Sequence, residues 1–341
     1  MRKIIIVSVM GLLLFVALPL IFFNPRLWIE IYVHETVRNH GSLLYHAAHR
    51  WVVPYFEPDK SVPPSMLNAL AGMLSDRDPK VRGEALTLVM YAADDKPENE
   101  KAFLAIPGIR EKLGNLVTDP DAGTAADSLS LLGRMRDKEN AALFREVLKT
   151  RFSDGQVVIA AIGALANTGD PDSLAEILPF VRDSRLRVSV EAINDISCYD
   201  DQRALDAMAE MLSSPGHECA AADAIMQFHG SFPKHDISAQ MDPALLAVTR
   251  NAGIADRTRL LGAISDAQTK VEACENILLF PGADPPMSQV NAALTLGDMK
   301  SVAASAVPAL EKVRDNPATI PYVRDAVEKA LKDIRPQSPP P

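Results

Sequence analysis

A unit of about 34 residues repeats along the chain from Ser65 onward, and this repeat limits the possible folds more than any other feature of the sequence. The clearest copy has an apolar helix at 68–74, an Asp/Pro turn, and a second helix that opens with Val81-Arg82. The same order returns at 174–192 and at 307–327. A repeat of this kind predicts a stack of helical hairpins.

Equivalent positions of the three clear copies are separated by whole numbers of units. Val81 precedes Leu186 by 105 residues, about three units, and Leu186 precedes Val323 by 137 residues, about four units. We expect about eight hairpins, with longer connections at 94–106 and 229–240. The predicted first helices start near residues 65, 107, 138, 171, 202, 241, 269 and 301. Further second helices are predicted at 122–135, 156–167, 218–228, 256–265 and 287–296.

The composition favours helices over strands. Apolar residues make up 48% of the chain but aromatic residues only 6%, and few segments alternate with the period of two that a strand requires. One pair of helices cannot bury its own apolar face, whereas stacked pairs share a continuous core. Gly133, Gly169 and Gly297 follow apolar runs and are expected to end helices in the left-handed conformation. We therefore predict an all-α fold, an α-solenoid over residues 65–334.

The units resemble HEAT repeats, especially those of the phycobiliprotein-lyase (PBS lyase) HEAT-like group. The likeness is carried by Asp78-Pro79, Val81-Arg82 and Ala85-Leu86, echoed by Asp183, Leu186-Arg187 and Val323-Arg324. The resemblance implies the fold and a ladder of Asp–Arg pairs between neighbouring units. It implies such a structural role for Asp78, Arg82, Arg187 and Arg324.

The N-terminal segment, 1–23, is predicted to be a transmembrane helix that acts as a signal anchor. Arg2 and Lys3 precede an uninterrupted apolar run at 4–23, and 20 helical residues span about 30 Å, the thickness of the hydrocarbon core. The bulky end of the run favours an uncleaved anchor, with a cleaved signal peptide as the alternative. The positive-inside rule then predicts a single-pass inner-membrane protein with the solenoid on the periplasmic side.

Two further segments flank the repeats. Residues 24–64 contain Trp28 and Trp51, and because Trp prefers the membrane–water interface, we predict a juxtamembrane amphipathic segment and linker. Within it, 27–33 is expected to continue the anchor helix and 43–51 to form a helix near the lipid headgroups. The Pro-rich tail at 335–341 is predicted to be disordered.

No motif assigns a reaction. The net charge of −9 disfavours a nucleic-acid partner, and phosphate-binding loops and nucleophile motifs are absent. The cysteines, Cys198, Cys219 and Cys274, form no CxxC pair; they fit small buried residues, or one disulfide and one thiol if the body is exported. We predict no catalytic, cofactor-binding or metal residues, no cofactor and no small-molecule substrate.

Two clusters suggest alternatives. His34, His40, His46 and His49 lie within 16 residues, and imidazoles bind zinc, copper or haem iron; the alternative is that they are interfacial polar side chains. His217-Glu218-Cys219 suggests a thiol nucleophile with a base, but adjacent helical residues point in different directions.

These patterns favour a non-enzymatic scaffold. Solenoids bind proteins along extended surfaces, usually lined by the second helices. We predict a membrane-tethered interaction scaffold, held by residues 4–23, that assembles or regulates a membrane or envelope complex. Metal or haem handling by the histidine cluster and a lyase-like activity are the alternatives.

Overall fold

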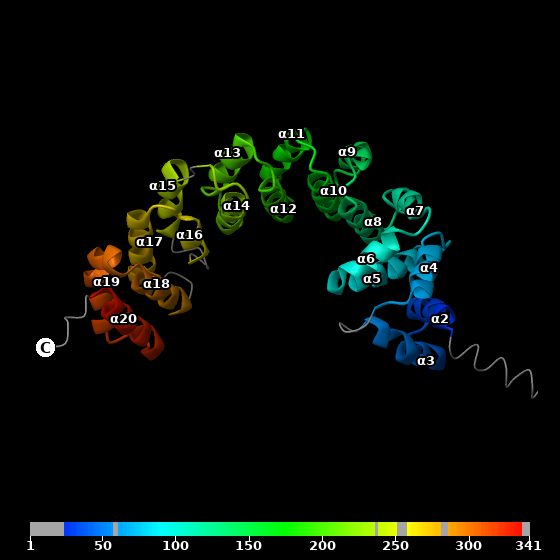
Figure 1. The fold of residues 1–341 in the computed structure, drawn as a ribbon, viewed down its shortest axis with the longest axis horizontal. Helices are drawn as coiled ribbons and strands as arrows, with labels where there is room; N and C mark the ends of the chain where they lie inside the picture. The colour runs from blue at the N-terminus through cyan, green and yellow to red at the C-terminus, as the bar shows by residue number, and fades with distance from the viewer. Residues whose placement is uncertain (1–23, 57–60, 236–237, 251–257, 281–285, 336–341) are drawn as a thin grey trace, which may run out of the picture. The chain divides into compact units, whose positions relative to one another are not determined.

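The computed structural model describes residues 24–56, 61–235, 238–250, 258–280 and 286–335. Within these ranges the regular secondary structure is entirely helical, so the all-α prediction is confirmed. The chain divides into two compact units, Met1–Thr168 and Gly169–Pro341. Figure 1 shows antiparallel helix pairs following one another within each unit.

The described part of the first unit begins with two helices and a short turn, followed by three hairpins. The opening elements are α2 (Pro25–Arg38), α3 (Leu43–Val52) and the 3-10 turn η1 (Val53–Phe56). The hairpins are α4 (Pro64–Met73) with α5 (Pro79–Asp95), α7 (Ile109–Leu116) with α8 (Ala122–Arg134), and α9 (Ala141–Thr150) with α10 (Gly155–Asn167). Helix α6 (Pro97–Leu104) and the turn η2 (Lys138–Asn140) connect them. The second helices pack in chain order, α5 on α8 and α8 on α10.

The second unit contains five hairpins among its described residues. The first pairs are α11 (Ser173–Ile177), extended by η3 (Leu178–Arg182), with α12 (Leu186–Ile196), and α13 (Gln202–Met211) with α14 (Glu218–Ser231). The next are α15 (Ser238–Thr249) with α16 (Thr258–Ala263) and α17 (Ala267–Leu279) with α18 (Pro286–Met299). The last pair is α19 (Val307–Asp315), preceded by η4 (Lys300–Ala306), with α20 (Pro321–Ile334). Here too, each second helix contacts the next.

The predicted hairpins therefore form, three in the described part of the first unit and five in that of the second. The predicted longer connection at 94–106 contains a helix, α6, that was not expected from the sequence. Phe103 of this helix is fully buried, so the segment adds a helix to the core instead of crossing the surface.

Aspartates set the starts of the second helices in the first unit. The side chains of Asp78, Asp121 and Asp154 accept hydrogen bonds from backbone N–H groups in the first turns of α5, α8 and α10. Such caps satisfy N–H groups that have no partner within the helix. The Asp-rich turns of the sequence thus mark where each second helix begins.

The three glycines expected to end helices have two different roles. Gly169 is left-handed, with φ +64°, as predicted. Gly133 and Gly297 are instead helical residues of α8 and α18, and the left-handed residues near them are Arg136 and Lys300, each with φ 52°. A Cβ on Gly133 would lie 2.6 Å from Cα of Ala164 in α10. Gly133 is therefore required for the close approach of two helices.

The prediction of a single-pass membrane protein is corrected by the structure. Across the described ranges, every helix is too short or too polar to cross a bilayer; the longest of those above, α5, has 17 residues. The predicted spanning helix at 4–23 lies outside the described residues, as does the tail from 336 onward.

The segment assigned to the membrane interface packs on protein. Helix α2 starts at Pro25, with the Asn24 side chain accepting from the backbone of Leu27, and it contacts α3, α4 and α5. Trp28 is 7% exposed and stacks on Trp51 with ring centroids 6.2 Å apart. Trp28 is therefore buried by packing between helices. A tryptophan in the sequence is equally compatible with packing against protein and with contact to lipid.

Candidate protein-binding surface

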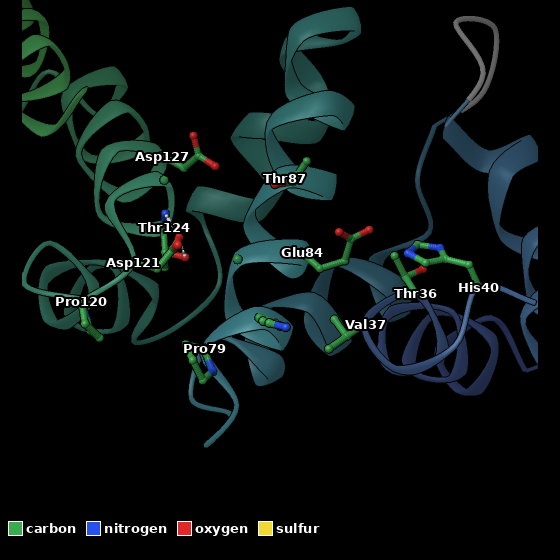
Figure 2. Close-up of a pocket in the computed structure, with 13 residues that line it drawn as sticks. Thr36, Val37, His40, Pro79, Glu84, Thr87, Pro120, Asp121, Thr124 and Asp127 are labelled. Carbon is green, nitrogen blue, oxygen red and sulfur yellow. Dashed lines mark hydrogen bonds between the residues drawn. The ribbon is translucent and has the colours of Figure 1, made fainter. Parts of the chain in front are cut away.

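A cavity of about 730 Å³ opens in the first unit between α2, α5 and α8. Figure 2 shows Glu84 of α5 between His40, from the segment after α2, and Asp121 and Asp127 of α8. Helices α5 and α8 line this cavity and also pack against the first helices of their hairpins, α4 and α7. The lining residues are Thr36, Val37, His40, Pro79, Lys80, Gly83, Glu84, Thr87, Pro120, Asp121, Gly123, Thr124 and Asp127.

Two carboxylates of the cavity lack a cationic partner in contact with them. Burial raises the pKa of Glu84, and the charge of His40 opposes this rise. Burial also raises the pKa of Asp127, and the neighbouring charge of Asp121 raises it further. Within the described part of the chain, neither side chain makes a hydrogen bond or an ion pair. Half-buried charges of this kind are costly unless a cation approaches them.

The third carboxylate is fixed in place by its own helix. Asp121 caps α8 and accepts hydrogen bonds from both the backbone nitrogen and Oγ1 of Thr124, each at 2.8 Å. The backbone hydrogen bond is the main cause that holds the pKa of Asp121 below its usual value. Lys80 is the one lysine or arginine that lines the cavity, so carboxylates outnumber it three to one.

Acidic residues recur at one position of the second helices. In α5, α12 and α14 this position precedes a buried Ala–aliphatic pair, as in Glu84-Ala85-Leu86, and α20 has the same pattern. Helix α8 has Asp127 before Ser128-Leu129, whereas α10 and α18 carry Ala160 and Asn291 there. The acidic members of the register are Glu84, Asp127, Glu191, Asp223 and Asp325. We call this position the acidic register; the sequence shows it only when the helices are aligned with one another, and it was not among the predicted sites.

The predicted ladder of Asp–Arg pairs is confirmed for Arg82 alone. Its Nε and Nη2 donate to Oδ2 of Asp119 at 2.8 and 2.5 Å, which joins α5 to the turn before α8. Asp78 caps α5 instead, and Arg324 donates to backbone carbonyls of its own hairpin. Arg187 is exposed. Of the four residues expected in the ladder, Arg82 alone makes an ion pair between repeats in the described part of the chain, and none of the three arginines lines the cavity.

The histidine cluster forms aromatic contacts. The rings of His40, His46 and His49 lie 5.3, 5.5 and 5.7 Å from the ring of Tyr45. No group of three His, Cys, Asp or Glu side chains suited to a metal occurs in the ranges that the structure covers. The arrangement therefore gives the metal or haem alternative no support.

In the second predicted cluster, His217 and Glu218 each contact a residue other than Cys219. Nδ1 of His217 lies 3.2 Å from Oγ of Ser214, and Glu218 accepts from the backbone of Gly216 at 2.7 Å. The three cysteines are free thiols; Cys198 is exposed, and burial raises the pKa of Cys274 to about 12. A thiol with a raised pKa is a poor nucleophile, because the thiolate is the reactive form.

The sequence matches no protein-family model and no curated protein. Similar solved structures include the complex of CpcE and CpcF of phycocyanin lyase from Nostoc sp., at 15% identity and a TM-score of 0.41, covering 92% of this chain and 95% of that one. Human deoxyhypusine hydroxylase in complex with glycerol has 17% identity and a TM-score of 0.32, covering 80% and 96%. A designed armadillo repeat protein has 16% identity and a TM-score of 0.31, covering 79% and 100%.

These neighbours include enzymes and a designed repeat protein, and at such identities and TM-scores they transfer no function. The resemblance to HEAT-like repeats does not rest on them. It is supported independently by the helical hairpins of the chain itself, whose second helices pack in sequence within each unit.

Proposed function

We propose that this chain is a protein-interaction scaffold and that it binds its partner on the second-helix face of the first unit. This face comprises the exposed sides of α5 and α8 around the cavity described above. The observation that carries the proposal is that Glu84 and Asp127 lie half-buried at an open cavity, where neither forms an ion pair with any described residue. A partner that brings positive charge would offset the cost of their burial.

The shape of the cavity agrees with a protein partner. It is open, and eight of the thirteen residues that line it have polar or charged side chains, whereas small-molecule sites are usually enclosed. Its carboxylates also repel nucleic-acid phosphates. The proposal assigns no reaction to the chain and requires no cofactor.

Site-specific photocrosslinking tests this function. A photoreactive residue replaces Thr87, which is exposed on the cavity wall, or Glu111, which is exposed on the first helix α7. We expect a defined protein to be captured from position 87 and not from 111. The captured protein is then purified, and its binding should weaken when Glu84→Gln and Asp127→Asn are combined. Equal capture from both positions, or binding that the double variant leaves unchanged, would contradict the proposal.

A further inference from the structure

The partner's chemistry can be defined more closely from the arrangement of the acidic register. We propose that the second-helix face of the first unit binds an extended segment of the partner with Lys or Arg at every third residue, one cation at Glu84 and the next at Asp127. This inference rests on the proposed function and specifies the kind of segment that is bound.

The charges that face the cavity favour a cationic occupant. Glu84, Asp121 and Asp127 contribute three carboxylates from two neighbouring helices, against Lys80 and the imidazole of His40. Asp121 and Asp127 also repel each other, which is one of the two causes of the raised pKa of Asp127. A cation near Asp127 would offset this repulsion.

The spacing of the helices favours an extended segment. Packed helices lie about 8–10 Å apart, so equivalent positions on α5 and α8 repeat at about that distance. An extended segment in the polyproline II conformation rises about 3.1 Å per residue with three residues per turn, so side chains at i and i+3 lie on the same side and about 9 Å apart. Side chains at i and i+2, or at i and i+4, are about 6 or 12 Å apart along the segment and point in different directions.

Other occupants fit the cavity less well. A bound metal ion is disfavoured because the described residues hold no group of three metal-donor side chains. A cavity of about 730 Å³ is also far larger than one ion requires. A helical segment would place neighbouring cations of one face only about 5–6 Å apart, at i and i+3 or i+4. These spacings make the extended segment distinguishable from a helix by experiment.

Peptides of equal charge and different spacing test the inference. Each labelled peptide carries four lysines separated by one, two or three Gly/Ser residues, and binding to the full-length chain is measured by fluorescence anisotropy. We expect the peptide with two intervening residues to bind at least about tenfold more tightly than the others. Glu84→Gln and Asp127→Asn should each weaken that peptide about tenfold and reduce its preference over the others. Excess chelator should change nothing.

Glu111→Gln is the matched control, because it removes one carboxylate charge from the exposed face of α7. It should leave the affinity within about twofold of the wild type, and circular dichroism should show all three variants folded. Equal affinity for all three spacings would overturn the inference and would leave only general attraction between opposite charges. Weakening by Glu111→Gln as large as that by Glu84→Gln would overturn it too.

The two proposals can fail separately. Position-dependent crosslinking at residue 87 combined with no preference among the peptides would retain the scaffold function and reject the extended segment. If crosslinking does not depend on position, the function itself fails, whatever the peptides show.

Discussion

Asp195 of α12 is a residue whose protonation is coupled to folding. Burial raises its pKa from 3.8 to about 7, and the charge of Glu191, one turn earlier, contributes further. In the unfolded chain the carboxyl ionises near pH 4, whereas in the folded chain it keeps its proton until about pH 7. Its contribution to stability is therefore fully present below about pH 4 and is lost as the pH rises to about 7.

We expect Asp195→Asn to remove this dependence. The free energy of unfolding of the wild type, relative to the variant, should fall between about pH 4 and 7 and stay constant above that range. Denaturant unfolding at pH 4, 5, 6, 7 and 8 measures the difference. A difference that rises with pH across this window would show that the carboxylate is stabilised by a partner and not penalised by burial.

Gly133 and Gly114 are helical glycines whose replacement by Ala should change the free energy of unfolding in opposite directions. Gly133→Ala would place a Cβ 2.6 Å from Cα of Ala164, and we expect a loss of about 1–3 kcal/mol in the free energy of unfolding. Gly114→Ala in α7 has no atom within 4 Å of the new Cβ and should gain roughly 0.5–1 kcal/mol, because Ala favours the helix. Chemical denaturation of both variants measures the two changes in the free energy of unfolding. A loss of stability in both variants would show that the higher helix propensity of Ala does not determine the effect at Gly114.

Ion pairs connect elements unequally in this chain. Arg82 and Asp119 join α5 to the turn before α8, and their side chains are 15% and 3% exposed. Arg182 and Glu210 join η3 to α13, but both side chains are more than half exposed. Removal of one partner from a buried pair leaves an uncompensated charge, whereas water screens an exposed pair.

We therefore expect Asp119→Ala to destabilise the protein by about 3 kcal/mol and Glu210→Ala by less than about 1 kcal/mol. Thermal and urea unfolding of the two variants measure the difference. Similar losses would indicate that Asp119 acts mainly through its hydrogen bond to the backbone of Asp121.

Helix order was predictable from the sequence, because Asp and Pro in the turns and apolar residues at helical spacing are local signals. The contacts between helices were not. Nothing local distinguishes Gly133, which allows α10 to approach, from Gly169, which ends a helix. The cavity was missed for the same reason, since α2 contributes its wall only by packing on α5. The apolar and aromatic residues of 24–56 fit burial against protein as well as burial against lipid.

Contacts in each unit are mostly between neighbouring hairpins, as expected for a repeat protein. A destabilising substitution in one hairpin should therefore lower the stability of the neighbouring hairpins, and this effect should decrease with distance along the chain. Leu296 of α18 is fully buried, and Leu296→Ala should cost about 2–5 kcal/mol locally.

Hydrogen exchange with mass spectrometry tests this expectation. Protection should fall in α17, α18 and α20 of the Leu296→Ala variant and remain unchanged in α5 and α8. A uniform loss of protection in both units would show that the whole chain unfolds as one cooperative body.

The glycine contact of α8 has a counterpart in the second unit, where a Cβ on Gly297 would lie 3.2 Å from Cα of Ala330. The pairs α8–α10 and α18–α20 also make the most extensive helix contacts in their units. Backbones in direct contact cannot slide past each other without a clash. When the chain is pulled from its ends, the α8–α10 and α18–α20 contacts should resist separation, and the remaining hairpin interfaces should open first.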